Sequence, residues 1–180
     1  GMVVHPDFAT SRLFTTCQTH QENGQPKDVR LVTWKLSADG TSAQKWRALL
    51  TGLPISTGRH SGCRPTIAPG AVNDSGEDEL FVGTGDVAQA DVPQSRTSLG
   101  GKVLRLDLET GFPLSGNPFF SLENDRERYI YSYGHRNIQG VAVQPGTGAI
   151  YTAEHGPSNN DEVNLITAGG NYGWDPSRKG

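Results

Sequence analysis

Residues 141–156 read VAVQPGTGAIYTAEHG. A short apolar strand is followed by a proline, a glycine-rich turn and a second strand that ends in polar residues. Strand-forming residues on both sides of such a turn predict a β-hairpin. Since the chain shows no long amphipathic helical pattern, the stretch favours an all-β fold.

The same pattern occurs in two other parts of the chain. It begins at Met2 in MVVHPDFATSRLFTTCQ and at Pro65 in PTIAPGAVNDSGEDELFVGTGD. The prolines of the three hairpins, Pro6, Pro69 and Pro145, lie 63 and 76 residues apart. The second hairpin differs from the others by the insertion AVNDSGEDE before its second strand. Repetition at a spacing of this kind predicts a structural unit that is used several times.

Further strands follow each hairpin. Third strands are expected at 29–36, 102–108 and 162–166, and fourth strands at 43–50 and 128–133. The first two third strands alternate apolar and polar residues, as half-buried strands do. Repeated units of four antiparallel strands are typical of β-propeller blades, and closed propellers have about four to eight of them. We therefore interpret residues 1–180 as one partial β-propeller domain of about three blades.

The composition excludes several classes of protein. The formal net charge is −3 and the hydrophobic fraction is 34%. No run of basic residues is present to neutralise phosphates, which argues against a nucleic-acid partner. No apolar stretch approaches the roughly 20 residues that a membrane-spanning helix needs.

The two cysteines, Cys17 and Cys63, do not form a CxxC pair, which argues against a zinc site. Two buried thiols and one disulfide are both compatible with their positions. A disulfide would imply an oxidising compartment.

Two loops resemble each other where an innermost strand is about to begin. They read STGRHSGCRP at 56–65 and YSYGHRNIQG at 131–140, and each carries a histidine and an arginine. In a propeller such loops surround the central channel. Convergent cationic groups there suit an anionic cofactor or substrate, although solvated side chains would explain one loop taken alone.

The ends of the second strands carry oxygen ligands. GTGD ends in Asp86, and EHGPSNNDE at 154–162 combines several carboxylates with the turn Gly156-Pro157. Carbonyl and carboxylate oxygens are the ligands that Ca²⁺ prefers. A turn with solvated carboxylates would account for the same residues.

Three motifs occur in a fixed order: GHRNIQG at 134–140, EHGPSNNDEVNLI at 154–166 and GGNYGW at 169–174. With them the sequence resembles the glucose/sorbosone dehydrogenase family, which includes soluble PQQ-dependent glucose dehydrogenase and the aldose sugar dehydrogenases. GMVVHPDF, RHSGCR, LFVGTGD, GKVLRLD and NPFF resemble the same family, so the resemblance covers nearly the whole chain. It implies a propeller of six four-stranded blades, with pyrroloquinoline quinone (PQQ) and Ca²⁺ at the mouth of the channel.

The resemblance also implies roles for four side chains. His60 matches the catalytic histidine, the general base that takes a proton from the C1 hydroxyl of the sugar while hydride passes to the quinone. Asp86 matches the aspartate that supports this histidine. Arg136 and Asn137 match the residues that bind PQQ. The sequence assigns no role to His135.

Calcium ligands follow from the same resemblance. Gly156 and Pro157 match the pair whose backbone carbonyls bind the active-site Ca²⁺, and Glu162 resembles a ligand of a second, structural calcium. The family also uses a glutamine from an earlier blade, and a lysine and further arginines from later blades. These residues have no counterpart in the 180 residues, so we expect the chain to be the central part of an enzyme.

The family often has glycine where Cys63 stands, and Cys17 ends the equivalent strand of the previous blade. We therefore predict a Cys17–Cys63 disulfide. The predicted location is extracytoplasmic, periplasmic or secreted, with any export signal or anchor ahead of Gly1.

The expected function is PQQ- and Ca²⁺-dependent oxidation of aldose sugars at C1 to lactones, with an external electron acceptor. One alternative is a non-catalytic binding propeller, like the Hedgehog-interacting relatives of the family. Another is a calcium-dependent hydrolase of the gluconolactonase kind. That hydrolase would need metal-binding side chains from several blades, whereas this sequence offers mainly backbone carbonyls.

Overall fold

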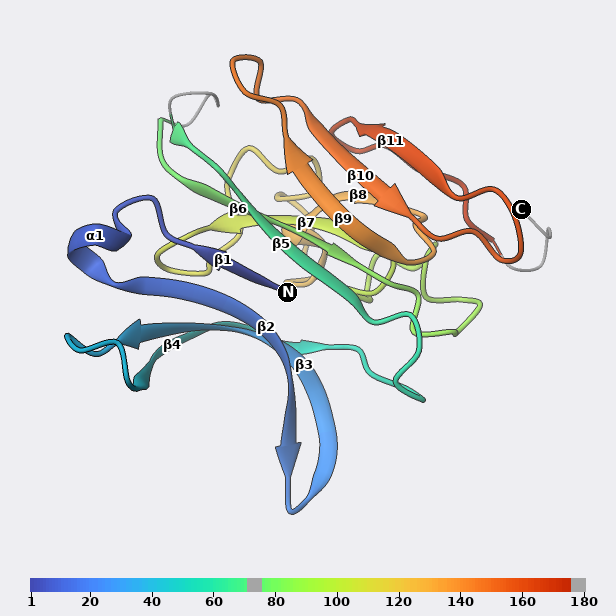
Figure 1. Ribbon diagram of the computed structural model, residues 1–180. Coiled ribbons are helices and arrows are strands. Elements are labelled where there is room, and N and C mark those ends of the chain that lie inside the picture. Colours follow the sequence, from blue (N-terminus) through green and yellow to red (C-terminus); the bar gives the residue numbers. More distant parts are fainter. Residues whose placement is uncertain (71–75, 176–180) are drawn as a thin grey trace.

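The computed structural model describes residues 1–70 and 76–175 (Figure 1). These residues form three successive antiparallel sheets. The first has the order β1-β2-β3-β4 and consists of β1 (Met2–Val4), β2 (Leu13–Glu22), β3 (Gln25–Leu36) and β4 (Ala43–Leu53). The second has the order β5-β6-β7-β8 and consists of β5 (Gly62–Ala68), β6 (Glu79–Thr84), β7 (Lys102–Asp107) and β8 (Ile130–Tyr133). The third has the order β11-β10-β9 and consists of β9 (Ile138–Val143), β10 (Ile150–Glu154) and β11 (Glu162–Ile166).

This arrangement confirms the all-β propeller prediction, and each sheet is one blade. Every predicted strand is present, with bounds that shift by a few residues. Within the described residues the helices are short, namely α1 (Phe8–Ser11) and the 3-10 helix η2 (Glu127–Tyr129). None of these helices is long and apolar enough to span a membrane. Of the predicted insertion, residues 71–75 lie outside the described part of the chain, and Glu79 already belongs to β6.

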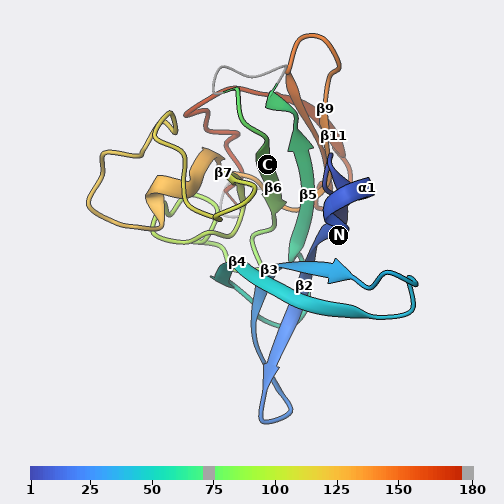
Figure 2. The same ribbon diagram turned by 90° about the vertical axis from the view of Figure 1, so that its left-hand side faces the viewer.

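The second strand of the first blade is longer than predicted. The sequence pattern places its end near Thr16, but β2 runs to Glu22 and pairs with β3 along its whole length. The two strands form a ribbon that projects from the body of the protein (Figure 2). Asn23 and Gly24 make the turn with φ of 52° and 76°, and both residue types tolerate this left-handed conformation. The Asn-Gly pair was the sequence signal for this hairpin.

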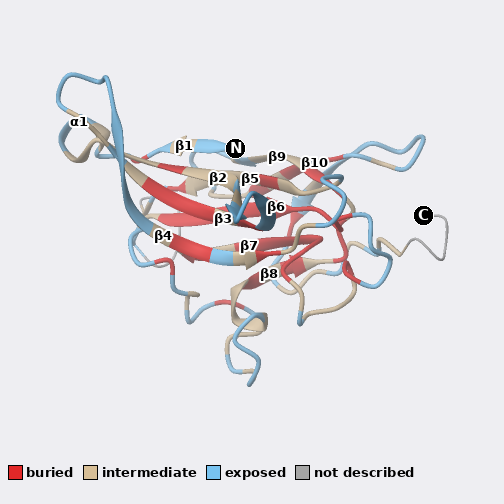
Figure 3. Cartoon of the chain, turned by 90° about the horizontal axis from the view of Figure 1, so that it is seen from below, coloured by how far each residue is buried: buried red, intermediate tan, exposed pale blue. Residues whose placement is uncertain are grey.

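The second blade is covered on both faces. Leu80 and Val82 point into the core shared with the first blade, and Phe81 points into the core shared with the third. Because side chains alternate along a strand, three consecutive apolar residues fill two separate cores. Figure 3 shows the resulting band of buried residues along β6 and β7. Each fully buried leucine of this kind contributes roughly 1.5–3 kcal/mol through the hydrophobic effect.

The alternating strand at 102–108 was expected to be half-buried, but β7 is covered on both faces, since Leu104 and Leu106 lie in the core shared with the first blade and Val103 lies in the core shared with the third. The Lys102 side chain, on the same face as Leu104, is also fully buried, at 0% exposure, because the segment before β7 encloses it and its Nζ donates to the carbonyls of Val92 and Gly100. Arg105 on the same strand is partly buried and forms an ion pair with the buried Glu79. The polar residues of this strand are paired inside the protein rather than solvated.

The predicted disulfide is confirmed. Cys17 of β2 and Cys63 of β5 are bonded, with their Cα atoms 5.9 Å apart. The bond connects the first blade to the beginning of the innermost strand of the second. Since it closes a loop across 46 residues, it restricts the unfolded chain substantially.

Candidate functional site

The four loop segments singled out in the sequence meet at one end of the blades. The innermost strands β1, β5 and β9 lie side by side, so the segments that precede β5 and β9 are neighbours. The Asp86 amide donates to the Arg136 carbonyl at 2.7 Å, and the Val87 amide donates to the His60 carbonyl at 3.1 Å. The backbone thus joins the end of β6 to both histidine-containing loops.

His60 and Asp86 form the pair that the sequence predicts. His60 Nδ1 lies 2.8 Å from Asp86 Oδ1, and the same oxygen accepts the Ala88 amide at 2.8 Å. The Asp86 side chain is 3% exposed, whereas His60 keeps 24% exposure. A carboxylate on Nδ1 selects the tautomer that has its proton there, which leaves the Nε2 lone pair as an acceptor.

Arg136 lies against this pair. Its Nη2 is 3.3 Å from His60 Nε2, and its Nη1 donates to the His155 carbonyl at 3.0 Å. Within the described residues, Arg136 Nε is a buried donor without a hydrogen-bond partner. Buried donors are normally satisfied, so this atom indicates a missing acceptor. A guanidinium is well suited to bind the carboxylates of an anionic ligand.

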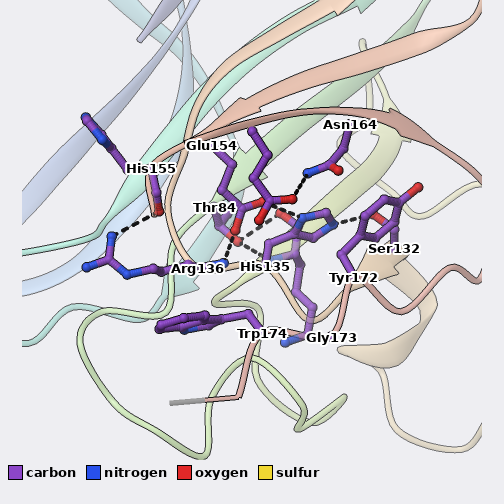
Figure 4. A network of polar contacts seen from close by, with 12 residues as sticks. Thr84, Ser132, His135, Arg136, Glu154, His155, Asn164, Tyr172, Gly173 and Trp174 are labelled. Carbon is purple, nitrogen blue, oxygen red and sulfur yellow. Dashed lines mark hydrogen bonds and ion pairs between the residues drawn. The ribbon is translucent and has the colours of Figure 1, made fainter. Parts of the chain in front are cut away.

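His135, to which the sequence assigned no role, holds this loop together. It is 0% exposed; its Nδ1 lies 2.9 Å from Glu154 Oε2 and its Nε2 lies 2.8 Å from Ser132 Oγ (Figure 4). The other Glu154 oxygen accepts the Arg136 backbone amide. The order Ser-His-Glu resembles a nucleophilic triad, but Ser132 is 0% exposed and no substrate reaches it. The buried Ser132–His135–Glu154 cluster therefore fixes the backbone of Arg136.

The Asn137 side chain is held by a hydrogen bond from Gln139. Its Oδ1 accepts Gln139 Nε2 at 2.9 Å, and Gln139 Oε1 accepts Arg64 Nη2 at 2.9 Å. Gln139, also unassigned in the sequence, thus links two blades. The amide NH₂ of Asn137 donates to no group in the described residues, which leaves it available to a ligand.

The turn after β10 contains Gly156 and Pro157, whose backbone carbonyls the sequence predicts as calcium ligands. A Cβ on Gly156 would collide with the carbonyls of Asn159 and Asn160, so glycine is required there. Its amide donates to Asp161 Oδ1 at 2.9 Å, and this bond, followed by that of His155, lowers the pKa of Asp161 below its ordinary 3.8. In the part of the chain that is described, the Gly156 and Pro157 carbonyls accept no hydrogen bond and keep free lone pairs.

Part of this set lines one cavity of about 150 Å³, whereas His60, Asp86 and Asn137 are not in its lining. Its lining includes Arg136, Gly156, Pro157, Glu162 and Trp174. Across residues 1–70 and 76–175, no three His, Cys, Asp or Glu side chains gather as a metal site. Glu162, predicted as a ligand of a separate calcium, lines the same cavity as Gly156 and Pro157.

Several contributors were not found from the sequence. Trp174 donates its Nε1 hydrogen to Asp86 Oδ2 at 2.8 Å, and its ring lies under the Arg136 guanidinium. Lys102 fixes the segment between Asp86 and β7, since its Nζ donates to the carbonyls of Val92 and Gly100. Burial lowers the pKa of Lys102 to about 7. The GGNYGW motif contained the signal for Trp174, whereas Lys102 looked like an ordinary exposed strand residue.

Comparison with known proteins identifies the family of the chain. Residues 1–180 match the family model described as Glucose / Sorbosone dehydrogenase. The chain is 33% identical to the aldose sugar dehydrogenase of Escherichia coli over 96% of its own length and 44% of that protein. It is 34% identical to quinoprotein glucose dehydrogenase B of Acinetobacter calcoaceticus, over 97% of this chain and 39% of that protein.

Solved structures show the same similarity. A putative oxidoreductase (glucose dehydrogenase) from Thermus thermophilus superposes with a TM-score of 0.82 at 39% identity, over 97% of this chain and 50% of that one. The PQQ-bound aldose sugar dehydrogenase of Streptomyces coelicolor gives a TM-score of 0.78 at 31% identity, over 97% of this chain and 47% of that one. The chain thus spans about half the length of the proteins that it matches.

Proposed function

This chain belongs to the glucose/sorbosone dehydrogenase family, and from that premise we propose that it forms the central part of a PQQ- and Ca²⁺-dependent enzyme that oxidises aldose sugars at C1 to lactones. The main support is one arrangement: His60 Nε2 lies 3.3 Å from Nη2 of Arg136, and the buried Nε of the same arginine has no partner in the described residues. A base and an unsatisfied cation in one place suit a sugar hydroxyl beside an anionic cofactor.

The residues present fit such a cofactor and its metal. Arg136 and the NH₂ of Asn137 would bind PQQ carboxylates, and the Gly156 and Pro157 carbonyls would bind Ca²⁺. When bound, PQQ supplies an acceptor for the C1 hydride, and Ca²⁺ makes that acceptor more electrophilic. Glu162 would add negative charge beside the cation or, as the sequence predicts, bind a second calcium.

The protein's own chemistry is proton transfer. His60 Nε2 takes the proton of the C1 hydroxyl, which would occupy the place where Arg136 Nη2 now donates. Asp86 keeps the proton on Nδ1 and stabilises the imidazolium as it forms. Because Asp86 is almost fully buried, its interaction with His60 is weakly screened by solvent.

The proposed enzyme is extracytoplasmic and passes its electrons to an external acceptor. The Cys17–Cys63 disulfide supports this location, since such bonds persist mainly in oxidising compartments.

The test is dye-linked oxidation of an aldose panel by the complete native polypeptide, with PQQ and Ca²⁺ supplied or omitted. Activity should require both. Arg136→Met should weaken PQQ binding in a fluorescence titration, whereas Arg12→Met, beside α1, should not. A folded protein that neither binds PQQ nor oxidises any aldose would refute the proposal and favour the binding-propeller alternative.

A further inference from the structure

We propose that Trp174 is a positioning residue that holds the Asp86 carboxylate against His60 and orients the Arg136 guanidinium beside this pair. This inference rests on the proposed function. Two contacts carry it: Trp174 Nε1 donates to Asp86 Oδ2 at 2.8 Å, and the Arg136 Cζ lies 5.4 Å from the centre of the Trp174 ring. Figure 4 shows the indole alongside the Arg136 guanidinium, with its backbone continuing from Gly173.

The hydrogen bond matters because Asp86 has two oxygens with different tasks. Oδ1 accepts the His60 ring and the Ala88 amide. Oδ2 accepts the Trp174 indole, and in the described residues it has no other donor. Since the carboxylate is almost fully buried, loss of this donor would leave Oδ2 unsatisfied. The carboxylate would then turn to find another partner, and Oδ1 would move away from His60.

The contact between the Trp174 ring and the Arg136 guanidinium affects the orientation of Arg136. A guanidinium on an aromatic face is attracted by the electrons of the ring, and the flat surface restricts its orientation. The end of Arg136 that faces His60 is therefore set partly by Trp174. One side chain thus connects the support of the base with the residue proposed to bind the cofactor.

The Trp174 backbone is fixed independently of its ring. Its amide donates to the Gly134 carbonyl at 2.8 Å, and its carbonyl accepts Gln94 Nε2 at 3.0 Å. A change of the side chain should therefore leave the main chain in place. Trp174→Phe keeps an aromatic face for Arg136 and removes only the N–H donor, while Trp174→Ala removes both.

Trp34 provides a matched control. Its indole donates to Thr16 Oγ1 at 2.9 Å within the first blade, away from the site. Trp34→Phe therefore removes the same kind of hydrogen bond without touching Asp86. Any effect of Trp174→Phe that is shared by Trp34→Phe is an effect on packing.

The experiment has two readouts on the complete native polypeptide. The first needs no cofactor: the downfield proton NMR signal of His60 Nδ1–H, identified by its loss in Asp86→Asn. Trp174→Phe should shift or broaden this signal, and Trp34→Phe should leave it unchanged.

The second readout is kinetics with PQQ and Ca²⁺: Trp174→Phe should lower kcat about tenfold at unchanged KM, as expected for one hydrogen bond of about 1.4 kcal/mol. Trp174→Ala should in addition weaken PQQ binding.

A Trp174→Phe protein with an unchanged His60 signal and unchanged kcat would overturn the inference, even if its melting temperature fell. Absence of sugar oxidation in the unmodified protein would instead refute the proposed function. In that case the NMR readout alone still decides whether Trp174 positions the His60–Asp86 pair.

Discussion

The two similar loops before β5 and β9 both contain a histidine whose Nδ1 contacts a carboxylate, yet they differ at the other ring nitrogen. His135 Nε2 is bonded to Ser132 and the ring is fully buried. His60 Nε2 contacts only Arg136 among the described residues, and the ring remains partly exposed. The same pair of groups is thus an anchor in one loop and a candidate base in the other. The partner at Nε2 is the difference that makes His60, and not His135, the candidate base.

A third pair extends the comparison to the surface. His155 Nδ1 lies 3.3 Å from Asp161 Oδ1, and the two side chains are 59% and 70% exposed. The three histidine–carboxylate pairs therefore range from buried to solvent-exposed. We expect mutations in the three pairs to differ in their effects on activity and on stability.

The largest effects should separate activity from stability. His60→Ala should lower kcat by a factor of about 10²–10⁴, the usual contribution of a general base, with little change in unfolding. His135→Ala should destabilise the protein by roughly 3–5 kcal/mol, because it removes the partner of the buried Glu154 Oε2 and of the buried Ser132 Oγ. Dye-linked kinetics and urea denaturation of both variants measure the two effects. Equal loss of stability in both variants would contradict the distinction.

The next effect concerns how each loop is anchored. The His60 loop is attached covalently through Cys63, whereas the His135 loop relies on Glu154. Replacement of Cys17 and Cys63 by serine should cost roughly 4 kcal/mol, as expected for a loop of 46 residues.

Hydrogen exchange should then rise at 56–65 and stay unchanged at 131–140. If exchange rose equally in both loops, the disulfide would not be a local anchor of the His60 loop.

The smallest expected effect on stability is that of the exposed His155–Asp161 pair. The pKa of Asp161 is lowered, first by the hydrogen bond from the Gly156 amide and then by that with His155. The stability that these contacts give the folded protein is fully present at pH values above the ordinary pKa of 3.8. It is lost as pH falls through the lower folded value. The Gly156 amide chemical shift should therefore titrate with a midpoint below 3.8. Asp161→Asn should abolish this titration, and a midpoint at or above 3.8 would rule out the contact.

Much of the fold could be predicted because turn residues and prolines separate the strands clearly, and the motifs at 134–140 and 154–166 locate the site. Burial could not be predicted in the same way. The charge of Lys102 suggests a solvent-facing side chain, and nothing in the pattern of β7 reveals that the carbonyls of Val92 and Gly100 enclose its amino group. The two His-Arg loops also look equivalent in sequence, because the difference between His60 and His135 arises from partners on other strands.

The most direct test is a crystal structure of the complete native polypeptide with PQQ, Ca²⁺ and an aldose. The account predicts that the C1 oxygen of the sugar lies within hydrogen-bonding distance of His60 Nε2. Arg136 should contact the cofactor, and the Gly156 and Pro157 carbonyls should contact the metal. A sugar bound away from His60, or with a carbon other than C1 facing it, would contradict the assignment of His60 as the base.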